Sequence, residues 1–194
     1  MNFLAHIYLS GTNEQVRIGN FIGDHVKGRS YQNYPEKIKE GILLHREIDS
    51  YTDNHHLVKE TMNFFRPSYR RYSGIIVDMI FDHLLAANWN EFHPDQLNKF
   101  AKTFYRSLVK NYRILPRPVK YFTPFIIQNN RLYSYKDIKG IQEAIQIMAN
   151  HTSLPDYTDQ AIATLEKNYS EIKDLFILFM NDIDRHVNNV HFGA

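Results

Sequence analysis

The chain has 194 residues, of which 43% are hydrophobic and 14% aromatic. This length and apolar content can bury one sizeable core, so we expect a single domain over residues 1–194. The 23 Lys and Arg nearly balance the 21 Asp and Glu, which excludes the large basic excess of a general nucleic-acid-binding protein. The lack of cysteine excludes disulfides and thiolate metal sites and is compatible with the cytoplasm.

The first residues, MNFLAHIYLSG, carry no basic segment and reach His6 after three apolar residues. They are predicted to begin the fold and not to act as a signal peptide. No apolar run approaches the roughly 20 residues that span a bilayer. We therefore expect a soluble cytoplasmic protein with neither a membrane nor a nucleic-acid partner.

Helical periodicity runs through nearly the whole chain, and the turn residues that would separate short strands are missing, which predicts an all-α helical bundle. Asn13 is placed to cap a helix that extends to about Val26. Pro35 suits the first position of a helix through EKIKEGILLHREIDSY. Pro67 suits the start of another helix, which is predicted to continue to about Trp89.

The second half of the chain is also predicted to be helical. Pro94 and Asp95 begin the segment DQLNKFAKTFYRSLVKNY, and DIKGIQEAIQIMAN follows later. One long helix is predicted from Tyr157 to about Val187, because apolar residues recur there at helical spacing. Between these helices, LPRPVKYFTPF holds three of the seven prolines, so we expect it to be irregular but packed.

The segment DMIFDHLLAANW places charge in a helix that is apolar around most of its circumference. Asp78 and Asp82 share one face, and His83 flanks them. Two carboxylates in an apolar environment repel each other and lose hydration, so a cation must compensate them. A divalent metal is one such cation. The alternative is a structural ion network with one of three arginines, Arg46, Arg70 or Arg71.

A second set of the same residue types lies in GILLHREIDSYTDN, where His45 and Asp49 share a helical face beside Arg46. Imidazole and carboxylate groups suit Mn²⁺, Fe²⁺ or Zn²⁺, and two such pairs on packed helices can close a metal site. Asp24 and His6 lie in two further apolar segments. The first 83 residues thus hold seven candidates, His6, Asp24, His45, Asp49, Asp78, Asp82 and His83.

Four blocks of the sequence, MNFLAH, IGNFIGDHVKG, GILLHREIDSYTD and DMIFDHLLAANW, resemble in order and spacing the bacterial acyl carrier protein phosphodiesterases. The likeness covers essentially the whole chain and is strongest over residues 1–89. That family is similar to the HD-domain metal-dependent phosphohydrolases, which are all-helical and hold a divalent ion with His and Asp. This chain departs from the usual HD pattern, because its adjacent pair, Asp82 and His83, has the reversed order.

The resemblance implies an HD-domain-like bundle that hydrolyses the phosphodiester between 4'-phosphopantetheine and a serine of holo acyl carrier protein. The expected ion is Mn²⁺, with Mg²⁺ or Fe²⁺ as alternatives. Four residues are the implied metal ligands: Asp24, His45, Asp82 and His83. Such an ion would lower the pKa of water and polarise a phosphoryl oxygen.

The catalytic residues expected beside the metal are His6, Arg46, Asp49 and Asp78. Asp49 or Asp78 would complete the coordination or orient the nucleophile, and Arg46 would stabilise charge on the phosphoryl oxygens. His6 would protonate the departing serine oxygen. The alternative for His6 is a core histidine bonded to the backbone.

A carrier protein of this kind is small and strongly acidic, so its docking surface should be basic. The segment VKNYRILPRPVKYF offers Arg113, Arg117 and Lys120 among aromatic residues, and RPSYRRY is a second candidate. Either segment can instead be an ordinary solvated helix face. Two other functions stay open, namely an HD-like phosphohydrolase acting on a nucleotide or another small phosphoester, and a non-catalytic helical binding module.

Overall fold

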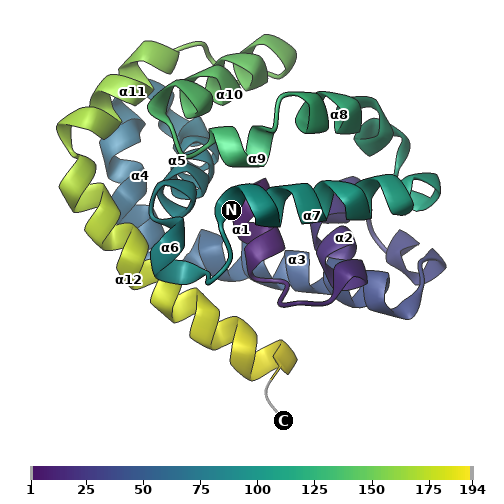
Figure 1. The fold of residues 1–194 in the computed structure, drawn as a ribbon. Coiled ribbons are helices and arrows are strands. Elements are labelled where there is room, and N and C mark those ends of the chain that lie inside the picture. Colours follow the sequence, from purple (N-terminus) through teal and green to yellow (C-terminus); the bar gives the residue numbers. More distant parts are fainter. Residues whose placement is uncertain (1, 193–194) are drawn as a thin grey trace.

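The computed structural model describes residues 2–192, and this part of the chain contains helices and turns but no strand (Figure 1). The all-α prediction is therefore confirmed. The elements are α1 Phe3–Tyr8, α2 Glu14–Ile22, η1 Gly23–His25, η2 Ser30–Asn33, α3 Glu36–Asn54, α4 His56–Tyr69, η3 Arg70–Tyr72, α5 Ser73–Ala87, α6 Trp89–Phe92, α7 Leu97–Lys110, η4 Tyr112–Ile114, α8 Arg117–Gln128, α9 Arg131–Ser134, α10 Ile138–His151, α11 Thr158–Lys167, α12 Tyr169–Val187 and η5 Asn188–Phe192.

Helix α5 lies at the centre of the core, as its apolar sequence predicts. Helices α1, α4, α10 and α12 pack around it, and one continuous set of buried apolar side chains extends from Leu4 to Val187. In Figure 1, α12 runs along one edge of the molecule, while α7 crosses in front of α1 with α8 above it. None of the described helices combines the length and the apolar character that crossing a bilayer requires.

Helices α2 and α3 pack closely because glycine faces glycine where they meet. A Cβ atom at Gly19 would collide with the carbonyl oxygen of Ile38, and one at Gly41 would collide with that of Val16. Any larger residue at either glycine would therefore push the two helices apart. This close crossing fixes the position of the later turns of α3, which carry His45 and Asp49.

Several predicted helix starts match the structure. Asn13 caps α2, since its Oδ1 accepts hydrogen bonds from the backbone N–H groups of Gln15 and Val16 at 2.9 and 3.2 Å. Pro35 directly precedes α3, and the segment DIKGIQEAIQIMAN forms α10. The helix that was predicted to begin at Pro94 and Asp95 is α7, and it begins slightly later, at Leu97.

Two predicted boundaries are wrong. Pro67 does not begin a helix but lies inside α4, and the chain reverses at Arg70, whose φ of 47° interrupts the helical path before α5 begins. The single helix predicted from residue 157 to residue 187 is two helices, α11 and α12, that meet at Asn168. In both cases the predicted helix runs across a short break. The apolar periodicity continues on both sides of the break, so the sequence pattern does not reveal it.

The segment LPRPVKYFTPF is helical from Arg117 onward, so the prediction of an irregular stretch is wrong. Pro118 lies in the first turn of α8, where a backbone N–H would have no helical acceptor. Pro124 lies within the helix and cannot donate to the carbonyl of Lys120. The hydroxyl of Tyr112 donates to that carbonyl at 3.5 Å and so compensates in part.

Candidate functional site

Three side chains from two helices converge on one carboxylate. His6 of α1, His45 of α3 and Asp49 of α3 have potential ligand atoms that all lie within 4.8 Å of one another. The Nε2 atom of His6 is 3.2 Å from Asp49 Oδ1, and the Nε2 atom of His45 is 3.1 Å from Asp49 Oδ2. The two imidazole rings stack with their centroids 4.1 Å apart. Two nitrogen and two oxygen atoms therefore face a common point.

Local sequence explains how the rings reach this point. His45 and Asp49 are four residues apart, so they lie one above the other on the same face of α3. The ring of His45 lies directly against Gly23, where a Cβ atom would collide with it. The ring of His45 can therefore occupy this position only because residue 23 is glycine.

Asp24 forms the solvent side of the cluster. Its Oδ1 is 3.5 Å from His45 Nε2, and its side chain is 68% exposed, compared with 7% for that of His45. Asp49 lies between these extremes at 38%. The histidines therefore form the buried wall of the site, and the carboxylates form the side that a substrate in solution can reach.

Asn20 of α2 fixes the tautomer of His6. The Asn20 amide nitrogen donates to the His6 carbonyl at 2.9 Å and to Ser10 Oγ at 2.8 Å. Its oxygen consequently lies 2.8 Å from His6 Nδ1 and accepts a hydrogen bond from it. With its proton on Nδ1, neutral His6 presents the lone pair of Nε2 to Asp49. A lone pair that faces a carboxylate requires a cation or a proton between them.

The electrostatics of the cluster separate the two histidines. Burial lowers the pKa of His6 to about 4, so His6 is neutral at physiological pH. Burial alone would lower the pKa of His45 as well, but the carboxylates of Asp24 and Asp49 outweigh it and raise this pKa to about 9. Burial would likewise raise the pKa of Asp49, but the two histidines hold it well below its usual range.

The side chains of this cluster fit a divalent cation. Both ring nitrogens of His45 are buried without an aligned hydrogen bond, although Nε2 lies close to two carboxylates. Buried polar atoms in folded proteins almost always have a partner. Mixed nitrogen and oxygen donors suit Mn²⁺, Fe²⁺ or Zn²⁺. The residues that could hold such an ion are His6, His45 and Asp49, with Asp24 at the rim.

Asp82, which we predicted as a metal ligand, does not join this cluster. Its two carboxylate oxygens accept hydrogen bonds from the backbone N–H groups of Leu4 and Ala5 at 2.8 and 3.0 Å. They occupy the N-terminus of α1, a six-residue helix too short to be stable alone. Burial raises the pKa of Asp82 to about 7, against the opposing effect of these two bonds. Asp82 therefore positions the helix that carries His6.

His83 and Asp78 also lie outside the cluster. His83 Nδ1 donates to the carbonyl of Tyr135 at 2.8 Å, and its Nε2 lies 3.4 Å from the hydroxyl of Tyr169. His83, which we predicted as a ligand, thus ties α5 to two other parts of the structure instead of joining the cluster. Asp78 is one turn before Asp82 on α5, and burial raises its pKa. The aspartates of α5 are not neutralised by Arg46, whose position is different.

Arg46 stabilises the loop that follows Asp24. Its Nη2 donates to the carbonyls of Val26 and Gly28 at 2.9 and 2.7 Å, and the guanidinium lies over the ring of Tyr31. These contacts give Arg46 a positioning role in this loop, and its contact with phosphoryl oxygens stays a prediction. Since Asp24 begins this loop, Arg46 helps to hold the rim of the cluster.

The three residues predicted to bind a partner lie on η4 and α8. Arg113 and Arg117 are exposed, and Lys120 is partly buried. Lys120 Nζ donates to the carbonyl of Arg113 at 2.8 Å, and Arg117 donates to the hydroxyl of Tyr121. No metal-ligand candidate lies on these two elements.

Sequence reasoning missed Asn20, the residue that orients His6. Asn20 is completely buried on the otherwise mostly apolar α2. The available signal in the sequence was an amide flanked by Ile18, Gly19 and Phe21 inside the block IGNFIGDHVKG.

Fold and cluster together define a class: an all-helical protein with a half-open His and Asp site of the composition that metal-dependent hydrolases use. The particular family follows from sequence comparison, because the model of the family "Acyl carrier protein phosphodiesterase" matches residues 1–183. The chain belongs to this family, which confirms the resemblance seen in the four blocks.

Curated relatives agree with this assignment. Over 180 residues the chain is 31% identical to an acyl carrier protein phosphodiesterase of Yersinia pestis, covering 92% of this chain and 93% of the relative. It is 30% identical to proteins of the same name from Klebsiella pneumoniae strain 342, over 97% of this chain and 98% of the relative, and from Salmonella agona, over 91% and 92%. No solved structure matches the chain. The relation to HD-domain proteins stays a prediction.

Proposed function

We propose that this protein hydrolyses the phosphodiester that joins 4'-phosphopantetheine to a serine of holo acyl carrier protein, releasing the apo protein and 4'-phosphopantetheine. Family membership supports the substrate. The observation that carries the chemistry is the convergence of His6 and His45 on Asp49, beside the exposed Asp24. We place the activity in the cytoplasm.

The reaction is proposed to depend on a divalent ion, with Mn²⁺ expected first and Mg²⁺ or Fe²⁺ as alternatives. When bound, such an ion would lower the pKa of water and offset the negative charge of the diester. His6, His45, Asp49 and Asp24 are the residues proposed to hold it. This set replaces the one predicted from sequence by exchanging Asp82 and His83 for His6 and Asp49.

The remaining residues of the site orient these four. Asn20 holds His6 with Nε2 directed at Asp49, and Asp82 holds the helix on which His6 lies. Because Nδ1 of His6 donates to Asn20 and its pKa is low, His6 fits a ligand better than a proton donor to the departing serine oxygen. Arg46 keeps the loop after Asp24 in place.

The test is incubation of the purified protein with holo acyl carrier protein and Mn²⁺, followed by mass spectrometry of the carrier. We expect loss of the mass of the prosthetic group, prevention of that loss by EDTA, and restoration when Mn²⁺ is returned. Intact holo carrier under these conditions, together with turnover of a nucleotide or another small phosphoester, would favour the alternative phosphohydrolase. Absence of both turnover and ion binding would favour the binding module.

A further inference from the structure

Basic and acidic residues are strongly segregated along this chain. Residues 96–136 contain nine of the 23 Lys and Arg and none of the 21 Asp and Glu. The rest of the chain is consequently acidic, with 14 basic against 21 acidic residues. The small overall net charge therefore conceals one strongly basic segment. Its basic residues are Lys99, Lys102, Arg106, Lys110, Arg113, Arg117, Lys120, Arg131 and Lys136.

This segment folds into one surface made of α7, η4, α8 and α9, which we call the α7–α8 surface. Of the nine large apolar side chains that the structure describes as exposed, four lie on it: Val109, Tyr112, Tyr121 and Phe125. Val109 is 62% exposed although it lies on a regular helix. Exposed apolar side chains within a basic surface are typical of sites that bind another protein.

A cavity of about 610 Å³ gives this surface a defined shape. It lies between α7 and the end of α8, where Val109, Ile127 and the ring of Tyr105 form apolar walls. Lys102, Arg106 and Lys110 line it from successive turns of α7. A groove with apolar walls and a row of cations fits an amphipathic helix with acidic residues.

Most cations of the segment have no acidic partner within the protein. Lys99 pairs with Asp95, Lys110 with Glu14 at 3.4 Å, and Arg131 with Glu143. In the part of the chain that the structure describes, the other six form no salt bridge. Lys102 and Arg106 are both exposed and adjacent along the groove. Their charge is therefore available to a partner.

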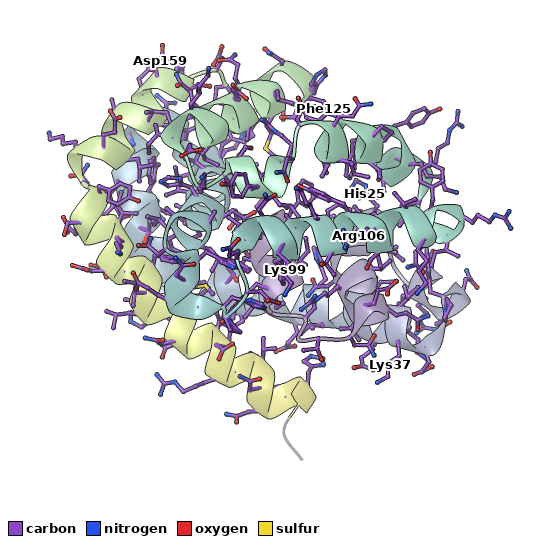
Figure 2. All side chains as sticks on the ribbon, viewed as in Figure 1. His25, Lys37, Lys99, Arg106, Phe125 and Asp159 are labelled. Carbon is purple, nitrogen blue, oxygen red and sulfur yellow. The ribbon has the colours of Figure 1, made fainter. Side chains whose placement is uncertain are left out.

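The α7–α8 surface extends to the candidate site. Phe122 of α8 packs against His25, with ring centroids 5.6 Å apart, and His25 follows Asp24 directly. Phe104 of α7 packs against Phe21 of α2, three residues before Asp24. In Figure 2, His25 is seen between the ribbons of α7 and α8, with Arg106 on one side and Phe125 on the other. The face of α8 that carries Phe122 thus lies next to the segment that carries Asp24.

We propose that the α7–α8 surface is the docking site for an acidic helix of the carrier protein, with an apolar side chain of that helix between Val109 and Ile127. Its carboxylates pair with Lys102 and Arg106, and the attached phosphodiester then lies at Asp24. This rests on the proposed function and adds a binding groove to Arg113, Arg117 and Lys120, which lie on the same surface.

The experiment measures docking separately from hydrolysis by using the apo carrier protein, which has no bond to cleave. In the variant Lys102→Glu/Arg106→Glu, Kd for the apo carrier and KM for the holo carrier should rise by about 10- to 100-fold, while kcat and Mn²⁺ affinity stay unchanged. The matched control is Lys139→Glu/Lys167→Glu, which changes the net charge equally on exposed positions of α10 and α11. The control should bind the carrier as the wild type does.

The outcomes distinguish this docking site from the proposed function. If the wild type cleaves holo carrier but the groove variant and the control have the same KM, the docking site is wrong and the function stands. Equal weakening in both variants would also overturn it, because the effect would then be one of net charge alone. If the wild type binds a single-stranded oligonucleotide through Lys102 and Arg106 more tightly than it binds the apo carrier, a nucleic-acid surface replaces the proposal.

Discussion

Two groups of His and Asp residues in this molecule contain the same residue types but lie in different surroundings. On α3, His45 and Asp49 face another histidine, His6, and the solvent-exposed Asp24. On α5, Asp82 and His83 face main-chain N–H and C=O groups and a tyrosine hydroxyl. Spacing along a helix thus determines which residues share a face, and the opposing element determines their chemistry.

The two groups differ in whether their buried polar atoms have hydrogen-bond partners within the protein. Each oxygen of Asp82 and the Nδ1 of His83 has a hydrogen-bond partner within the protein, so neither needs a cation. The Nε2 of His45 is buried and lacks an aligned donor or acceptor, although two carboxylates lie near it. The first group is complete without a ligand, whereas the second has a buried ring nitrogen that a bound ion would satisfy.

The largest effect expected from this comparison is on ion binding. His45→Ala should reduce Mn²⁺ affinity and turnover by more than about 100-fold, since even residues behind a ligand contribute ~10- to 100-fold. His83→Ala should keep its Mn²⁺ affinity while losing stability. Calorimetric titration of each variant with Mn²⁺ provides the measurement. Loss of Mn²⁺ binding in His83→Ala with retention in His45→Ala would reverse the assignment of the two groups.

The next effect is on folding. Asp82→Ala leaves the N–H groups of Leu4 and Ala5 buried without acceptors, so the free energy of unfolding should fall by about 2–4 kcal/mol. Urea unfolding followed by circular dichroism measures this. The control is Asp95→Ala, which removes an exposed pair with Lys99 and should leave the stability nearly unchanged. Equal stability of both variants would argue against the cap on α1.

A smaller effect is expected behind the ligands. Asn20→Ala removes the acceptor of His6 Nδ1, so His6 can adopt the wrong tautomer, and Mn²⁺ affinity should fall by about 10- to 100-fold. The control is Asn88→Ala, which removes an amide that donates to the carbonyl of Leu84 on α5. An Asn20→Ala variant that binds Mn²⁺ like the wild type would mean that His6 is not a ligand.

A further expected effect is the pH dependence of stability that Asp82 contributes. Its pKa is about 7 in the folded protein and 3.8 ordinarily, so between these values the folded state keeps a proton that the unfolded state has released. Stability therefore decreases as pH rises through this window, by at most about 1.4 kcal/mol per pH unit, and is constant above it.

The variant Asp82→Asn carries an amide at this position, which does not titrate in this pH range. The difference in unfolding free energy, wild type minus Asp82→Asn, should therefore fall from about pH 4 to about pH 7 and then level off. Urea unfolding of both proteins at several pH values gives this difference, in which other titrating groups cancel. A difference that is flat across the window would show that the pKa of Asp82 is not raised.

Much of the fold could be read from the sequence, because apolar periodicity reports burial directly. The deep position of α5 and the cap at Asn13 follow from local patterns. The boundary at Arg70 could not be predicted, since a positive φ at an arginine depends on tertiary contacts. The helix around Pro124 also depends on a non-local contact. The carbonyl that Pro124 leaves without a donor is bonded by Tyr112, which lies twelve residues before Pro124.

The sequence identified the residues of the candidate site, but it could not show which of the candidates lie together. Helical spacing brought out His45 and Asp49, and His6 and Asp24 were already candidates. Which of these meet depends on the close crossing at Gly19 and Gly41 and on the placement of α1, and neither is a local property. Asp82 carried the same sequence signal as Asp49, so only the structure could separate them.

The cap on α1 also has a consequence for the order of folding. It joins Leu4 to a residue 78 positions later, so closing it requires a long loop to form first. During synthesis α1 leaves the ribosome well before its cap, and His6 stays unplaced until α5 has packed. A partly folded chain would therefore lack the placed His6 that the proposed ion site needs. Pulse-labelling hydrogen exchange should find the amides of Leu4 and Ala5 gaining protection together with those of α5.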